Sequence, residues 1–226
     1  MTRIVIIGGG SGGFRLAQAL AKNLTEKDNT DVIVLEKNAF FYHVVGAPRA
    51  YVDADYTDKM FIPYDNAIPK HSAKFVRIVR GVATRISAET NEVSYHAIGS
   101  DDRQSEATET LQFDYLVLAT GSSYSVPIKP DSREFARSAT EAKLQEVRGH
   151  IEKAKNVLVV GGGSVGVEVA AEIKAKYPTK SVTIVDANDK LIAGNNLRNK
   201  FYTYLNESLE KLVVVFFFPN LHLISI

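Results

Sequence analysis

A short glycine-rich turn occurs twice in this chain, each time after a run of β-branched residues. The first copy reads IVIIGGGSGGF at residues 4–14, and the second reads VLVVGGGSVGV at residues 157–167. Both have the spacing G-x-G-x-x-G, carried by Gly8, Gly10, Gly13 and by Gly161, Gly163, Gly166. In such a turn the first glycine permits a tight bend, the second lets a pyrophosphate approach the backbone, and the third lets the following helix contact the strand. The repeat therefore predicts two dinucleotide-binding units.

Each turn is followed by a second apolar strand that ends in an acidic residue. Glu36 lies 23 residues after Gly13, and Asp186 lies 20 residues after Gly166. A carboxylate at this place can accept hydrogen bonds from the 2′-hydroxyl of a ribose and repels a 2′-phosphate. The acids strengthen the dinucleotide interpretation, and Asp186 favours NADH over NADPH. The alternative is a structural corner with a solvated acid at the end of a strand.

The residues between the motifs predict an α/β fold. We expect helices over 11–24, 164–177 and 196–212, a helix around Tyr42 to Tyr51, a buried strand at 30–36 and a further strand that ends at Thr120. Residues 74–98 alternate like an antiparallel β-meander, and 99–110 are polar enough for a loop or hairpin tip. The predicted architecture is two Rossmann-like domains with parallel sheets and a small meander in the first. Their boundaries are 1–123 and 124–226, with Pro127 and Pro130 at the junction and both domains incomplete at the C-terminus.

Composition excludes several classes of site. The formal net charge is +1, which gives no reason to predict nucleic acid as a partner. The chain has no cysteine, so it cannot carry a disulfide, a thiolate metal site or a redox-active cysteine pair. Its five histidines show no ligand spacing, and we predict no metal. Neither a targeting peptide nor a transmembrane segment is expected. The predicted location is the cytoplasm, with peripheral membrane association left open.

Two longer stretches resemble a known family. FFYHVVGAPRAYVD at 40–53 and VVGGGSVGVEVAAEIKAKYPTKSVTIV at 159–185 resemble FAD- and NAD(P)-dependent pyridine nucleotide oxidoreductases. This group includes type II NADH dehydrogenases and pyridine nucleotide-disulfide reductases. Within it, the chain is most similar to apoptosis-inducing-factor homologues of the ferroptosis-suppressor type, which are NAD(P)H:quinone reductases.

The resemblance implies which residues contact each cofactor. FAD is assigned to the first turn and its surroundings: Gly8, Gly9, Gly10, Ser11, Gly12, Gly13, Glu36, Arg49, Ala83, Thr120 and Gly121. NAD(P)H is assigned to Gly161, Gly163, Gly166, Glu168 and Asp186. Arg49 would pair with the pyrophosphate, the alternative being a surface arginine. Glu168, placed in the first helical turn, would contact the nicotinamide side or stabilise the helix dipole. Tyr42 and His43 are expected near the flavin, as packing residues or as acid–base groups. No catalytic residue is assigned.

The implied activity is electron transfer from NADH through flavin to a quinone or another small acceptor. The absence of cysteine excludes the disulfide-reductase branch. The resemblance also implies a C-terminal truncation, because family members carry a further FAD-contacting segment and a C-terminal domain that contributes to the quinone site and the membrane contact. Residues 213–226 look foreign to the fold. The alternatives are therefore a catalytically inactive nucleotide-binding fragment and, less consistent with two complete motifs, a dehydrogenase with a single NAD site. Oligomeric state is not predicted.

Overall fold

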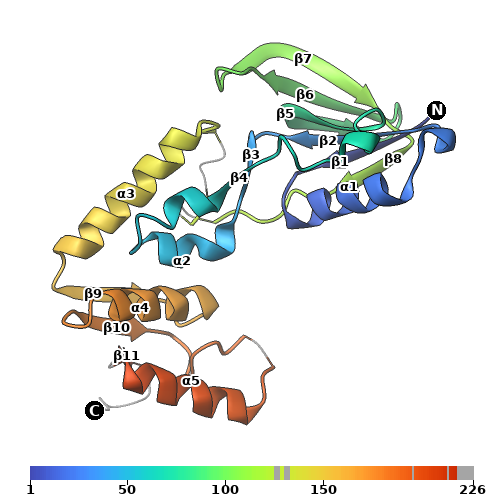
Figure 1. Cartoon of the computed structure of the whole chain (residues 1–226). Coiled ribbons are helices and arrows are strands. Elements are labelled where there is room, and N and C mark those ends of the chain that lie inside the picture. Colours follow the sequence, from blue (N-terminus) through green and yellow to red (C-terminus); the bar gives the residue numbers. More distant parts are fainter. Residues whose placement is uncertain (125–127, 130–132, 195, 213, 218–226) are drawn as a thin grey trace. The chain divides into compact units, whose positions relative to one another are not determined.

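The computed structural model describes residues 1–226 except 125–127, 130–132, 195, 213 and 218–226 (Figure 1). The chain divides into two compact units, which are described separately. The first unit comprises residues 1–43 and 59–140, and the second comprises 44–58 and 141–226. The sequence predicts a single domain boundary after residue 123. In the structure the chain changes from one unit to the other three times, after residues 43, 58 and 140. Pro127 and Pro130 of the predicted junction lie outside the described residues.

The first unit is built on a six-stranded sheet with the order β7-β6-β5-β2-β1-β8. Strands β5, β2, β1 and β8 run parallel where they pair with one another, while β6 and β7 are antiparallel additions. Its main elements are β1 (Thr2–Ile7), α1 (Ser11–Asn23), β2 (Thr30–Glu36), β5 (Val76–Ser87), β6 (Glu92–Ile98), β7 (Gln104–Gln112) and β8 (Tyr115–Leu118). The strand order reverses between β1 and β8, and in open α/β sheets ligands bind at such a reversal.

Two expectations for this region are wrong in part. The meander prediction misses that β5 begins as a parallel partner of β2, from Val76 to Arg80, and turns to pair with β6 only from Gly81 onward. Of the predicted polar loop or hairpin tip at 99–110, residues 99–103 connect β6 to β7 as a hairpin tip, whereas the residues from Gln104 form a strand whose backbone pairs with β6. The polar side chains of β7 mark a strand with a solvated face, which hydrophobic patterning alone does not distinguish from a loop.

Both faces of this sheet are covered at its central strands β1 and β2 (Figure 1). On one face, Ile6, Val32 and Val34 contact Ala17 and Ala21 of α1. On the other face, alternate residues of β1 and β2 contact the strands that curl over them; this second core contains Val5, Ile7, Ile33, Leu35, Val93 and Tyr95. Because successive side chains of a strand point to opposite faces, the unbroken apolar runs of β1 and β2 are what a sheet covered on both sides requires.

The buried carboxylate of Asp31 links three strands near their N-terminal ends through ionic hydrogen bonds. Asp31 on β2 is 4% exposed and accepts hydrogen bonds from Arg3 on β1 at 2.8 Å and from Arg77 on β5. The buried carboxylate is therefore neutralised by two guanidinium groups that still reach water.

Short elements lie between α1 and β2 and between β2 and β5. They are η1 (Glu26–Asp28), β3 (Phe40–Tyr42), η2 (Val44–Gly46), α2 (Ala47–Ala50), η3 (Thr57–Met60), β4 (Phe61–Pro63) and η4 (Lys70–Ser72). Strands β3 and β4 form an antiparallel pair. The helix expected around Tyr42 to Tyr51 is confined to η2 and the four residues of α2, and Tyr42 itself belongs to a strand.

The second unit repeats the strand–helix–strand pattern. Its sheet has the order β11-β10-β9, all parallel. The elements are α3 (Arg137–Lys153), which begins in the first unit, then β9 (Asn156–Val160), α4 (Ser164–Lys176), β10 (Ser181–Val185), α5 (Asn199–Lys211) and β11 (Val214–Phe217). Sequence patterning did not predict α3. The expectation that residues 213–226 are foreign to the fold is wrong for 214–217, which pair with β10; residues 213 and 218–226 lie outside the described residues.

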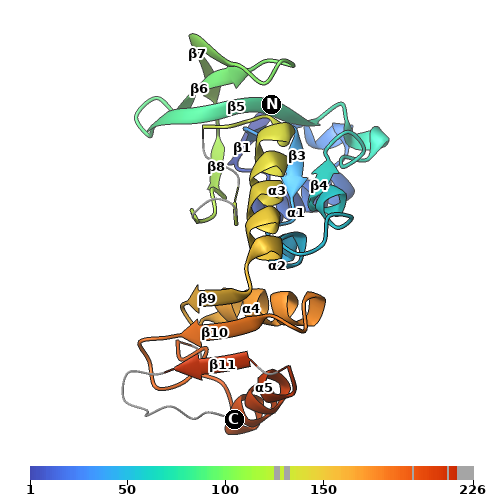
Figure 2. The same cartoon turned by 90° about the vertical axis from the view of Figure 1, so that its left-hand side faces the viewer.

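Among the described residues, only one face of this second sheet is covered. Val182 and Ile184 of β10 are buried, as are Val167, Ala170 and Ile173 of α4, which contacts β9 and β10 (Figure 2). On the opposite face Leu158 is 62% exposed and Val160 is 82% exposed. In the part of the chain that the structure describes, no helix is both long enough and apolar enough to cross a membrane.

Candidate dinucleotide-binding sites

The first glycine turn, residues 8–13, connects β1 to α1 at the reversal of strand order. Gly8 has φ +104°, a conformation that side chains other than glycine rarely adopt, and a Cβ there would lie 2.3 Å from the Ala119 carbonyl oxygen. A Cβ on Gly13 would lie 2.0 Å from the Gly8 carbonyl oxygen. The fold itself therefore requires glycine at both positions, to bring the turn against β8 and the helix against the turn.

Gly10 is different, because none of the described residues requires glycine there. Its φ is −69°, which any residue adopts, and a Cβ would have no neighbour within 4 Å. Gly10 is also the N-cap of α1, and no side chain caps the helix. The first N–H groups of an α-helix have no partner within the helix and attract anions. The structure thus leaves space and free donors at the same place.

Glu36 fixes the turn from the end of β2. One carboxylate oxygen accepts the Gly9 N–H at 2.5 Å, and the other accepts the Asn38 N–H at 2.8 Å. The residue is buried. Each carboxylate oxygen has a further lone pair, so the group can still accept a ribose hydroxyl.

Tyr64 is a neighbour of this turn that sequence reasoning missed. It follows β4 directly, its hydroxyl donates to the Gly9 carbonyl at 2.7 Å, and its ring lies 5.1 Å from that of Phe14 on α1. Burial, together with the charge of Glu36, raises the pKa of the Tyr64 hydroxyl far above its usual range. The group therefore remains protonated and able to donate. Because 55 residues separate Tyr64 from Gly9, no local motif could have indicated the contact.

The remaining predicted FAD residues of the first unit lie on β5, beyond its pairing with β2, and directly after β8. Pairing of β5 with β2 stops at Arg80, opposite Glu36. The strand continues to Ala83, which pairs with Tyr95 of β6 on one side only. Thr120 and Gly121 follow β8; Gly121 has φ +71°, and a Cβ there would meet nothing within 4 Å.

The second glycine turn, residues 161–166, repeats the geometry of the first. Gly161 has φ +108°, and a Cβ on Gly166 would lie 1.9 Å from the Gly161 carbonyl oxygen. Gly163 is the uncapped N-cap of α4 with φ −70°, and a Cβ on it would have no neighbour within 4 Å. In each turn the fold therefore requires the first and third glycines of the motif and does not require the second.

Asp186 occupies the place of Glu36. Its carboxylate accepts the Gly162 N–H at 2.5 Å and the backbone and side-chain N–H groups of Asn188, both at 2.7 Å. The hydrogen bond from the Asn188 backbone, followed by those from Gly162 and the Asn188 side chain, lowers the pKa of Asp186 below its usual value of 3.8. Asp186 is therefore fully charged at neutral pH.

The second turn differs in what contacts its middle glycine. The backbone N–H of Ile192 donates to the Gly162 carbonyl at 2.7 Å, and Leu191 lies where a Gly162 side chain would project. Ile192 has φ +54°, which for a β-branched residue stores strain of about 1–3 kcal/mol. The hydrogen bond from Ile192 thus keeps the loop after Asp186 in contact with the turn, and the backbone strain at Ile192 opposes this contact.

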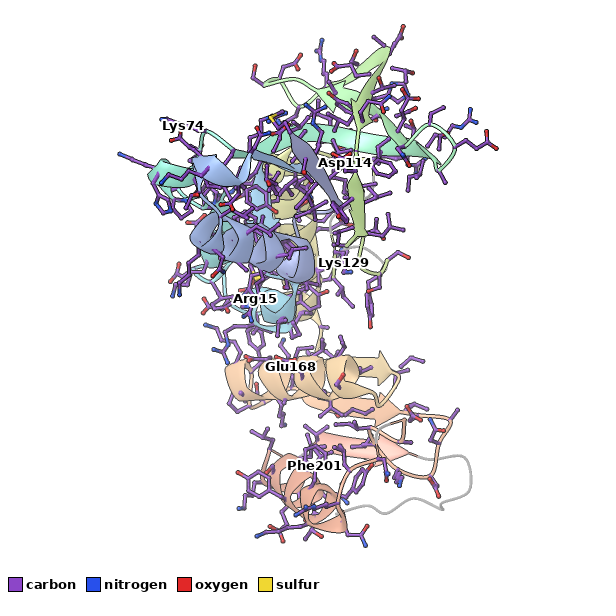
Figure 3. The ribbon with its side chains drawn as sticks, turned by 90° about the vertical axis from the view of Figure 1, so that its right-hand side faces the viewer. Arg15, Lys74, Asp114, Lys129, Glu168 and Phe201 are labelled. Carbon is purple, nitrogen blue, oxygen red and sulfur yellow. The ribbon has the colours of Figure 1, made fainter. Side chains whose placement is uncertain are left out.

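Arg49 and Glu168 both belong to the second unit. Arg49 donates through Nε and Nη2 to one Glu172 oxygen, at 3.0 and 2.8 Å, and its guanidinium lies 5.7 Å from the centroid of Tyr56. The hydrogen bond and charge of Glu172 raise the pKa of Arg49. The flavin contact of Arg49 stays a prediction. Glu168 is exposed on α4 (Figure 3). It is the fifth residue of that helix, so its predicted place in the first turn is wrong and dipole stabilisation is a weak explanation.

Tyr42 is the last residue of β3, and His43 directly follows it. The ring of Tyr42 is 5.4 Å from that of Phe61, and the His43 N–H donates to the Met60 carbonyl at 2.8 Å. The ring contact of Tyr42 indicates packing, the His43 hydrogen bond involves only its backbone, and neither gives an acid–base assignment. Among the described residues no cluster of histidine, aspartate and glutamate side chains could hold a metal ion.

The family model for pyridine nucleotide-disulphide oxidoreductases matches residues 2–219. The chain belongs to this family. Apoptosis-inducing factor homolog A of Dictyostelium discoideum is 33% identical over 215 residues, covering 92% of this chain and 47% of that protein. Ferroptosis suppressor protein 1 of Xenopus tropicalis is 37% identical over 186 residues, covering 81% and 43%. These matches confirm the family resemblance seen in the sequence. The chain spans about half the length of the curated relatives it matches.

Solved structures of other oxidoreductases share the fold. Sulfide:quinone oxidoreductase of Aquifex aeolicus has a TM-score of 0.70 at 14% identity, covering 96% of this chain and 51% of that one. NDH2 of Plasmodium falciparum in complex with NADH has a TM-score of 0.66 at 17% identity, covering 96% and 48%. They support the α/β class predicted from the sequence. The disulphide chemistry in the family name requires cysteine, and this chain contains none.

Proposed function

We propose that this chain binds FAD at the first glycine turn and NAD(P)H at the second, as part of an oxidoreductase that takes electrons from NADH. The observation that carries the proposal is the environment of Gly10 and Gly163. Each has ordinary backbone angles, an empty volume beside its Cα and an uncapped helix after it. A glycine that the protein's own packing does not require is explained by a ligand that approaches the backbone.

At the first turn, the proposed contacts are the turn residues 8–13 and Glu36, which would hold the pyrophosphate and the adenosine ribose of FAD. Beyond the end of β2, the backbone of Ala83 has one side not paired with β6, and this side is the proposed adenine contact. Thr120 and Gly121 would approach the cofactor from the end of β8. When bound, FAD supplies the two-electron chemistry, accepting a hydride and passing electrons on.

At the second turn, Asp186 favours NADH over NADPH. Its carboxylate is oriented by Gly162 and Asn188 and is ionised at neutral pH. It can accept hydrogen bonds from a ribose 2′-hydroxyl, whereas a 2′-phosphate would bring like charges together. Two unit charges about 4 Å apart repel by roughly 1–4 kcal/mol between the limits of bulk water and a protein surface. Glu168, exposed on α4, is proposed to contact the nicotinamide side.

The proposed acceptor is a quinone or a similar small molecule. A solved structure with the same fold is named a sulfide:quinone oxidoreductase, and the chain has no cysteine that could pass electrons to a disulfide. A second candidate function is nucleotide binding without turnover.

Matched variants test the proposal. Gly10→Ala should weaken FAD binding and Gly163→Ala should weaken NADH binding, each by about tenfold or more, the cost of inserting a methyl group into occupied space. Each variant should retain the other ligand and the wild-type unfolding temperature. Visible absorption measures FAD, and fluorescence measures NADH. Unchanged affinities in both variants would refute the sites. NADH-dependent quinone reduction with added FAD then separates an enzyme from a non-catalytic nucleotide binder.

A further inference from the structure

In the first turn, two side chains hold the peptide groups on either side of one glycine. The Gly9 N–H donates to Glu36 at 2.5 Å, and the Gly9 carbonyl accepts the Tyr64 hydroxyl at 2.7 Å. A peptide group is planar and trans, so its carbonyl and the following N–H point in opposite directions. Fixing the Gly9 carbonyl toward Tyr64 therefore fixes the Gly10 N–H away from Tyr64.

The second turn holds its middle glycine in the same two ways with a different donor. Asp186 accepts the Gly162 N–H, as Glu36 does for Gly9. The Gly162 carbonyl accepts the backbone N–H of Ile192 instead of a side-chain hydroxyl. Two unrelated segments thus supply a donor to the same carbonyl of the turn, one of them through a strained residue with φ +54°. This recurrence indicates that the turn geometry, and not chance packing, requires the donor.

We propose that Tyr64 is a positioning residue for the first dinucleotide site, which orients the Gly9–Gly10 peptide so that its N–H faces the phosphate position. Tyr64 does not touch the ligand in this proposal; it acts through the turn. The inference rests on the proposed function, because the phosphate position is that of bound FAD. It goes further by assigning a role to a residue outside the glycine motif, and by predicting that the second site does not depend on any equivalent side chain.

Tyr64→Phe is the direct test, because phenylalanine retains the ring contact with Phe14 and removes only the hydroxyl. Ser72→Ala is the matched control: it removes one hydroxyl that donates to a backbone carbonyl, that of Pro69 at 2.8 Å, in the same segment of the first unit. We expect Tyr64→Phe to weaken FAD binding about 3- to 10-fold, the usual value of one such hydrogen bond. NADH affinity should not change, and Ser72→Ala should bind both ligands like the wild type.

A ligand-free measurement separates this inference from the proposed function. Hydrogen exchange of the Gly9 amide should accelerate about 3- to 10-fold in Tyr64→Phe and not in Ser72→Ala. The reason is that Tyr64→Phe removes one of the two side-chain hydrogen bonds that fix the turn at Gly9. If the wild-type chain binds no FAD, the proposed function fails, and the Gly9 exchange still decides whether Tyr64 positions the turn. Wild-type exchange in Tyr64→Phe, or wild-type FAD affinity in a chain that binds FAD, would overturn the inference. An equal loss of FAD affinity in Ser72→Ala would also overturn it, by showing a general loss of stability.

Discussion

Alanine substitutions at two adjacent glycines should have opposite effects on stability. Both Gly12 and Gly13 lie in the first turn of α1. A Cβ on Gly13 would lie 2.0 Å from the Gly8 carbonyl oxygen, 3.0 Å from a methyl carbon of Ile6 and 3.1 Å from the Ala119 Cβ. A Cβ on Gly12 would meet nothing within 4 Å. The same chemical change is therefore forbidden by the fold at one position and free at the other.

The magnitudes follow from these distances. Replacing glycine by alanine inside a helix normally stabilises by about 0.5–1 kcal/mol, and this is the expected gain for Gly12→Ala. At Gly13 the closest contact is backbone, which cannot rotate away, so α1 must separate from β1. Overpacking a core costs about 1–3 kcal/mol, and a clash with backbone places Gly13→Ala at or beyond the upper end. After the helix gain is subtracted, we expect a net loss of about 2 kcal/mol or more.

Thermal unfolding followed by circular dichroism measures both variants. A loss of about 2 kcal/mol should lower the unfolding temperature by roughly 4–8 °C in a chain of this size, and Gly12→Ala should raise it by about 1–4 °C. Wild-type stability in Gly13→Ala would refute the argument that close contact between helix and turn requires this glycine. A large loss in Gly12→Ala would show that the open space beside it is occupied in the folded protein.

Three further predictions concern charge and exposed apolar surface. Asp31→Ala should lower the free energy of unfolding, measured by urea titration, by about 1–3 kcal/mol, because two arginines on the flanking strands lose their shared acceptor. The control Glu26→Ala removes an exposed ion pair and should lower this free energy by less than about 1 kcal/mol. Equal losses in the two variants would contradict the prediction. Asp186 has a lowered pKa, so its contribution to stability should be complete above pH 3.8 and disappear as the pH falls through the lower value of the folded state. Carboxyl NMR with a titration midpoint at or above 3.8 would contradict this. The double variant Leu158→Thr, Val160→Thr should have an unfolding free energy within about 0.5 kcal/mol of the wild type and a higher solubility, because both side chains are exposed on the uncovered sheet face. A clear loss of stability would show that this face is buried.

Much of the site was readable from the sequence because its signals are local. A strand, a glycine-rich turn, a helix and a second strand follow one another within about 30 residues in such a unit, and both turns have the predicted conformation at Gly8 and Gly161. Glu36 ends β2 and Asp186 directly follows β10, each beside its turn as the spacing predicts, although both carboxylates also accept backbone N–H groups of the turns themselves.

The sequence by itself determined two strand–turn–helix units and the acids that accompany them, because backbone conformation at glycine and the periodicity of apolar residues are properties of neighbouring residues. The tertiary structure decided what meets across longer distances. It placed Tyr64 on the Gly9 carbonyl, paired Arg49 with Glu172, made a strand of the polar residues from Gln104 and added β11 to the second sheet. These contacts depend on which surfaces are buried together when the chain closes on itself. The partners of Tyr64 and Arg49 lie 55 and 123 positions away, and separations of that size leave no periodic or spacing signal in the sequence.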